Sequence, residues 1–97
     1  VYGGRGLSVW SKNKKAQTVT EREHVGRIKE MACIVCQAPG PSEAHEIKQG
    51  QWFTSFPLCY SCHRGPYGIH GTKTHLIVRK MDELQCLNDT IRLLLYV

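Results

Sequence analysis

Two Cys-x-x-Cys pairs are the most distinctive chemical feature of this sequence. They are Cys33 with Cys36 and Cys59 with Cys62, and 22 residues separate the pairs. Two such turns that close on one ion supply four thiolates in the tetrahedral arrangement of structural zinc. The chain has five cysteines, an odd number, and four of them fall into these pairs, which favours a metal site over a disulfide framework. The spacing therefore predicts one structural Zn²⁺ held by these four cysteines.

Several histidines lie outside that set. Because zinc with four thiolates is coordinatively full, His45, His63, His70 and His75 need a second explanation. His75, past the others on a stretch predicted to be extended, is expected to be structural or exposed, so the first three are the candidates. Glu46 directly follows His45 in the sequence. A cluster of imidazole and carboxylate groups in a basic protein suggests a catalytic divalent ion with open positions for water and phosphate. We therefore expect a second metal site built from these side chains.

The chain that must position these groups is short and basic. It has 97 residues, with 13 Lys and Arg against 8 Asp and Glu, so its formal net charge is +5. A chain of this length buries only about 60–65% of the surface that its unfolded form exposes, and such a thin core gains from a bound metal. The positive charge favours an anionic partner such as nucleic acid. No apolar run approaches the ~20 residues of a membrane span, so we expect a soluble, cytoplasmic protein.

The N-terminal part is expected to contain an arm followed by a helix. Residues 1–19 hold four basic and no acidic side chains, which predicts a flexible basic arm. Thr20 and Glu23 match a capping box, and the apolar residues that follow are spaced as in a helix over about 20–32. We expect residues 20–97 to form one domain.

The remaining elements are expected to form a hairpin and a second long helix. Residues 43–47 and 52–58 have the composition of two extended segments joined by a loop. Residues 74–78 are predicted to be a third extended segment. Leucine and isoleucine at helical spacing predict a helix over about 81–95, in which Cys86 is a buried, inert thiol. The expected class is a small zinc-stabilised α+β fold with a helix on each side of the hairpin.

The order of these motifs resembles that of the HNH endonucleases. The matching residues are Cys33 and Cys36, then Ala44-His45-Glu46-Ile47, then Pro57-Leu58-Cys59 with Cys62 and His63, and finally His70. The resemblance implies the ββα-metal fold of that family, a hairpin and one helix that hold a divalent ion, over about residues 31–71. Within the superfamily, this part of the chain is similar to small phage and prophage proteins related to the recombination enhancement function nucleases.

This resemblance implies a metal-dependent endonuclease that hydrolyses phosphodiester bonds in DNA. His63 and His70 would then bind the catalytic ion, Mg²⁺ or another divalent cation. Lys48, Arg64, Lys73 and the N-terminal arm would contact DNA phosphates, and contacts of that kind are sensitive to salt and largely blind to sequence. The implied location is the cytoplasm of a bacterium or of a phage-infected cell.

The first strand of the family motif can be aligned with this chain in two ways. One alignment makes His45 a metal ligand and Glu46 the general base. The other makes His45 the base, a role that suits imidazole near neutral pH. The Asp that often precedes the family histidine is Ala44 here, and the Asn of the motif would fall near Thr54. The alternative function is therefore a zinc-stabilised module that binds nucleic acid or a partner with an inactive HNH site.

Overall fold

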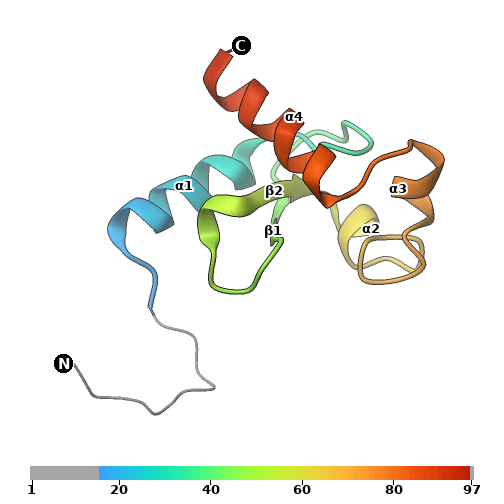
Figure 1. The fold of residues 1–97 in the computed structure, drawn as a ribbon, viewed down its shortest axis with the longest axis horizontal. Coiled ribbons are helices and arrows are strands. Elements are labelled where there is room, and N and C mark those ends of the chain that lie inside the picture. Colours follow the sequence, from blue (N-terminus) through green and yellow to red (C-terminus); the bar gives the residue numbers. More distant parts are fainter. Residues whose placement is uncertain (1–15, 97) are drawn as a thin grey trace.

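The computed structural model describes residues 16–96, which form a small mixed α/β fold (Figure 1). Within this range there is one antiparallel sheet of two strands. None of the helices in it is long and apolar enough to cross a membrane. Residues 1–15 of the predicted basic arm lie outside the described residues. The elements in chain order are α1 (Val19–Glu30), β1 (Glu43–Glu46), the 3₁₀ helix η2 (Trp52–Thr54), β2 (Ser55–Leu58), α2 (Tyr60–His63), α3 (Thr74–Val78) and α4 (Glu83–Tyr96).

Helix α1 confirms the first predicted helix, but the predicted capping residue is wrong. The Thr18 hydroxyl accepts a hydrogen bond from the N–H of Glu21 at 3.1 Å, and the Glu21 carboxylate accepts one from the N–H of Thr18 at 2.7 Å. This reciprocal pair satisfies the capping box two residues before the predicted one, so Thr20 lies inside the helix. The buried side chains of Val25 and Ile28 face the hairpin.

Strands β1 and β2 confirm the predicted hairpin. In their register His45 pairs with Phe56, and Glu46 pairs with Ser55. Every residue of β2 is buried, so this strand forms the floor of the molecule's core. Residues 52–54, expected to be extended, instead form η2, because the N–H of Thr54 bonds locally to the carbonyl of Gln51 at 3.1 Å.

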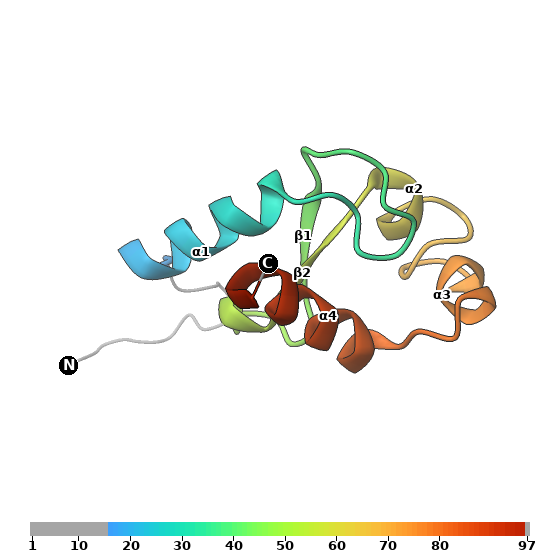
Figure 2. The ribbon, with the colours of Figure 1, turned by 90° about the horizontal axis from the view of Figure 1, so that it is seen from above.

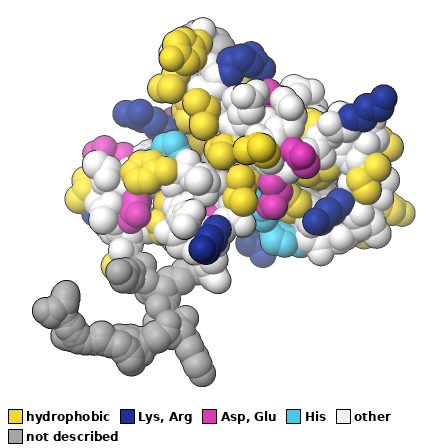
Figure 3. Space-filling model, in the orientation of Figure 1, with side chains coloured by type: hydrophobic (Ala, Val, Ile, Leu, Met, Phe, Trp, Pro, Cys, Tyr) yellow, Lys and Arg dark blue, Asp and Glu magenta, His cyan; other side chains and the backbone are white. Residues whose placement is uncertain are grey.

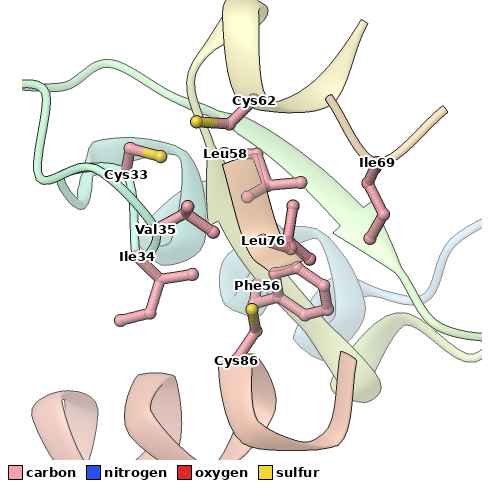
Figure 4. Packing of buried hydrophobic residues seen from close by; sticks show 9 residues of the cluster. All are labelled: Cys33, Ile34, Val35, Phe56, Leu58, Cys62, Ile69, Leu76 and Cys86. Atoms are coloured by element: carbon pink, nitrogen blue, oxygen red, sulfur yellow. The ribbon is translucent and has the colours of Figure 1, made fainter. Parts of the chain in front are cut away.

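The hydrophobic core lies against β2 and is closed by elements distant in the sequence. It joins the loop that carries the first cysteine pair to α2, α3 and α4 (Figure 4). Cys86 of α4 is completely buried there, as predicted, and burial raises the pKa of its thiol to about 12. The cluster consists of Cys33, Ile34, Val35, Phe56, Leu58, Cys62, Ile69, Leu76 and Cys86.

Residues 74–78 are helical, so the predicted extended segment is wrong. The N–H groups of Leu76 and Ile77 both bond to the carbonyl of Lys73, at 3.1 and 2.9 Å. An amphipathic strand would bury alternate residues, but only Leu76 enters the core, and Ile77 and Val78 are 64% and 65% exposed. A single core contact and local backbone bonds therefore override the β-branched composition of this segment.

Helix α4 confirms the predicted C-terminal helix, although Leu87 is the leucine of this helix that packs, partly buried, against the core cluster. Cys86 and Thr90 are its buried residues, and the Thr90 hydroxyl donates to the Cys86 carbonyl at 2.7 Å. Leu84 and Leu95 are exposed, and Figure 3 shows hydrophobic side chains on the surface over this helix. Its N-terminal half packs on β2, whereas its C-terminal half extends beyond the body (Figure 1).

The arrangement leaves α1 at one end of the molecule and the short helices at the other. Figure 2 shows α2 and α3 at the end opposite α1, with the hairpin and α4 between them. Contacts of His45 on β1 with His63 of α2 and with Glu83 of α4 join these three elements, and the histidines lie at this junction.

Candidate metal centres

The two Cys-x-x-Cys pairs meet in one cluster, as predicted. The four sulfurs of Cys33, Cys36, Cys59 and Cys62 all lie within 4.8 Å of one another. The Sγ atoms of Cys36 and Cys59 are 3.6 Å apart, and two sulfurs bound to tetrahedral zinc at about 2.3 Å are separated by about 3.8 Å. All five cysteines are free thiols. The cluster could therefore hold a structural metal ion such as zinc.

Each cysteine pair forms a turn that stabilises charge on its first sulfur. The N–H of Cys36 points to Cys33 Sγ at 3.5 Å, and the N–H of Cys62 points to Cys59 Sγ at 3.4 Å. Burial opposes ionisation of Cys33, but backbone N–H groups, that of Cys36 first, outweigh burial and lower the pKa of this thiol. Burial raises the pKa of Cys62, and the charge on Cys33 raises it further. Ionisation of Cys33 therefore opposes ionisation of Cys62, and a bound cation would offset this repulsion.

His75 of α3 lies beside this thiol cluster. Its Nδ1 is 3.5 Å from the Sγ of Cys62, a position from which an N–H can donate to a metal-bound thiolate. The sequence predicted only a structural or exposed position for His75 and not this contact, because the contact depends on the helix that replaces the predicted extended segment.

His45, His63 and His70 form a second cluster, at the junction of β1 and α2. His45 comes from β1, His63 from the end of α2, and His70 from the loop that follows. The Nε2 of His63 lies 3.3 Å from Nδ1 of His45 and 3.1 Å from Nε2 of His70. Two nitrogens bound to tetrahedral zinc at about 2.0–2.1 Å lie about 3.3–3.4 Å apart. The three imidazoles could therefore hold one metal ion.

The loop between His63 and His70 is folded tightly onto α2. The N–H of Ile69 donates to the Cys62 carbonyl at 2.7 Å, and the N–H of His70 donates to the His63 carbonyl at 3.1 Å. Gly68 permits this approach, because a Cβ there would lie 2.6 Å from the carbonyl oxygen of Ser61. These contacts return the chain so that two histidines seven residues apart face each other.

Two carboxylates contact the outer nitrogens of two of the three histidines, His63 and His45. Glu43 Oε1 lies 2.6 Å from His63 Nδ1 and also accepts a hydrogen bond from Arg64 Nε at 3.0 Å. Glu83 Oε2 lies 2.8 Å from His45 Nε2. The hydrogen bond from His63, together with that from Arg64, keeps the pKa of Glu43 below its ordinary value. Carboxylates that orient the outer nitrogen of a histidine are typical of metal sites.

These carboxylates also determine which histidine nitrogens carry protons. A carboxylate can only accept, so the proton of His63 lies on Nδ1 and that of His45 lies on Nε2. Burial lowers the pKa of His63, which favours its neutral form with a single N–H. The lone pairs of His45 Nδ1 and His63 Nε2 then face each other across 3.3 Å. Two facing lone pairs repel, and a cation between them converts this repulsion into coordination.

Glu46, the fourth predicted site residue, lies near the histidines but outside their cluster. Its Oε1 accepts a hydrogen bond from the N–H of Gly50 at 2.7 Å, which closes the turn after β1. Glu46 nevertheless lines the same open cleft as the three histidines, a hollow of about 510 Å³. Trp52 and Arg64 lie along the walls of this cleft.

One of the three basic residues predicted to contact DNA lines the histidine cleft. Arg64 lines the histidine cleft, and Lys48 is exposed in the turn after β1. Lys73 lines a separate hollow of about 280 Å³, together with Leu76 and Met81. The structure therefore brings one of the three predicted basic residues, Arg64, to the cleft wall.

Glu43 and Glu83 are the site residues that sequence reasoning missed. Glu43 could have been found, because residues two apart on a strand share a face and Glu43 precedes His45 by two. Glu83 lies 38 residues from His45, and no local pattern indicates their contact.

The fold and the two clusters define a small mixed α/β protein with a four-cysteine and a three-histidine candidate metal centre. Comparison of the chain with protein-family models, with curated proteins and with solved structures finds no match. The geometry of these two centres is therefore the basis on which a function can be inferred.

Proposed function

We propose that this protein is a metal-dependent endonuclease that hydrolyses phosphodiester bonds in DNA at an HNH-like ββα-metal site. The observation that carries the proposal is the convergence of His45, His63 and His70 on an open cleft, with two carboxylates behind them. An antiparallel hairpin followed directly by a short helix supports the same assignment. The four-cysteine cluster beside it would hold a structural zinc ion, because the chain is too short for a large core.

The donor set favours a transition metal over Mg²⁺ in the histidine centre. Mg²⁺ prefers oxygen ligands, whereas imidazole nitrogen suits zinc, nickel, iron and copper. When bound, such an ion stabilises negative charge on a phosphoryl oxygen and promotes ionisation of water. The three histidines would supply three ligands to such an ion and line the open cleft, so a further ligand could reach it from there, as in catalytic zinc sites.

The geometry supports the alignment in which His45 is a metal ligand and Glu46 is the general base. His45 Nδ1 belongs to the three-nitrogen cluster. The Gly50 N–H fixes Oε1 of Glu46, so Oε2 would accept the proton of the attacking water. Arg64 is 60% exposed, and its bond to Glu43 holds the guanidinium at the edge of the cleft, where it would bind a DNA phosphate.

The proposed activity is tested by nicking of supercoiled plasmid with Mg²⁺, Mn²⁺, Ni²⁺ or Zn²⁺. Wild type should nick DNA, His45→Ala and His63→Ala should lose nearly all activity, and Glu46→Gln should lose about 100-fold or more. His24→Ala, a histidine on α1 outside both centres, is the matched control.

Two outcomes contradict the proposal. Equal nicking by wild type and by the His45 and His63 variants would show that the activity comes from a contaminant. No nicking with any metal, combined with salt-sensitive DNA binding, would favour the zinc-stabilised binding module instead.

A further inference from the structure

Glu83 reaches the histidine centre from outside the hairpin and α2. Its Oε2 lies 2.8 Å from His45 Nε2, and the side chains of His45 and Glu83 are 10% and 38% exposed. Glu83 is the first residue of α4, a helix that contributes nothing else to the cluster of histidines. The contact therefore connects the C-terminal helix to a site that the hairpin and α2 otherwise build.

The contact selects which nitrogen of His45 faces the other histidines. Glu83 accepts the Nε2 proton, so Nδ1 presents its lone pair toward His63 Nε2 at 3.3 Å. Without this acceptor the ring could rotate by half a turn and exchange its two edges. One face of the ring is also fixed, because Phe56 lies against it with ring centroids 5.2 Å apart. Glu83 supplies the polar contact that chooses between the two orientations that this packing permits.

The start of α4 is itself held in place, so the Glu83 carboxylate is preorganised. The Asp82 carboxylate accepts the N–H of Gln85 at 2.8 Å, which caps the helix. Three residues after Glu83, Cys86 is completely buried in the core. The N–H of Met81 donates to the Leu76 carbonyl at 2.9 Å, which ties the entry of α4 to α3. These contacts fix the backbone on both sides of Glu83.

We propose that Glu83 is a positioning residue of the three-histidine centre, which holds His45 in the tautomer and ring orientation that bind the divalent ion. The inference rests on the proposed function, because it concerns the same centre. It goes beyond that function by making α4, which lies outside the resemblance to HNH endonucleases, a part of the metal site.

The test compares Glu83→Ala and Glu83→Gln with wild type in the full chain loaded with one equivalent of Zn²⁺. The four-cysteine cluster would take this ion, so that the histidine centre is left for nickel. Proton–nitrogen NMR of the imidazoles, without added nickel, should show a protected His45 Nε2–H signal in wild type that is lost in Glu83→Ala. Calorimetric titration with Ni²⁺ should show binding about 10–100-fold weaker in Glu83→Ala. Glu83→Gln should lose less, because the amide oxygen still accepts a hydrogen bond.

Asp89→Ala is the matched control, because it removes another carboxylate of α4 that also accepts a hydrogen bond, from Gln85 at 2.9 Å. It should leave the His45 signal and the nickel affinity unchanged. The inference is overturned if wild type binds no Ni²⁺, or if Glu83→Ala and Glu83→Gln keep both the signal and the wild-type affinity. The two proposals can fail separately. If wild type never nicks DNA, but Glu83→Ala keeps the wild-type fold and binds nickel more weakly, this inference is upheld while the proposed nuclease function fails.

Discussion

Removing the structural metal should unfold this protein. Structural zinc binding contributes about 10–16 kcal/mol at neutral pH, and small domains have a free energy of unfolding of about 5–15 kcal/mol. Cys33 and Cys62 are each 1% exposed and belong to the core cluster itself. The ion would therefore hold together the loop of the first pair, β2 and α2, and its loss would cancel most or all of the stability.

The assay measures helix content and thiol reactivity during chelation. Before chelation the proposed ion would protect the four cluster cysteines, and Cys86 is protected because it is 0% exposed with a pKa raised by burial to about 12. After a strong chelator is added, far-ultraviolet circular dichroism should lose its helical signal. All five thiols should become reactive in the same step, because Cys86 packs in the same cluster as Cys33 and Cys62.

Cys59→Ser and Cys86→Ala form a matched pair of cysteine variants. Cys59→Ser should be purified without zinc and largely unfolded, whereas Cys86→Ala should retain one zinc ion per chain and a folded spectrum. The predicted dependence of the fold on the metal ion is wrong if chelation exposes only four thiols while the helical signal and the protection of Cys86 persist. That result would mean that the apolar core is stable without the ion.

Three further changes test particular contacts. Gly68→Ala should destabilise the fold by about 1–3 kcal/mol in chemical denaturation, because its Cβ would meet backbone atoms of α2 at 2.6–2.7 Å; unchanged stability would contradict the close approach. His75→Ala should lower zinc affinity about 10-fold or more in chelator competition, because it removes the contact to Cys62 Sγ at 3.5 Å; an unchanged affinity would leave His75 without a role. Burial, with the charge of Arg27, lowers the pKa of His24 below 6.5, and no partner of its Nε2 is found among residues 16–96. Since the unfolded chain then binds a proton at His24 more readily, the contribution of neutral His24 to the free energy of unfolding should be complete above pH 6.5. It should be lost as the pH drops through the folded pKa. In thermal melts at several pH values, His24→Gln should show a smaller dependence of the melting temperature on pH.

Elements and residues whose signals are local could be predicted before the fold was known. Cys-x-x-Cys is a turn whose geometry follows from its own backbone, so pairing two such turns on one ion could be predicted without the fold. The hairpin and α4 were predictable from composition and periodicity in the same way. His45, His63 and His70 could be predicted as residues of a second metal site, because four cysteines already complete the zinc site.

Other features depend on tertiary packing, and no local sequence pattern indicates them. Residues 74–78 are helical, and Leu76 is the one residue of this segment that is buried in the core. Cys86 and Thr90 are the buried residues of α4, and Leu87 packs partly buried against the core. Leu84 and Leu95 are exposed, because only one side of the helix meets β2. Glu83 meets His45 across 38 residues, since the core contact of Cys86 fixes where α4 begins. The sequence gives the chemical type of each side chain, but the residue that it contacts depends on how helices and strands pack.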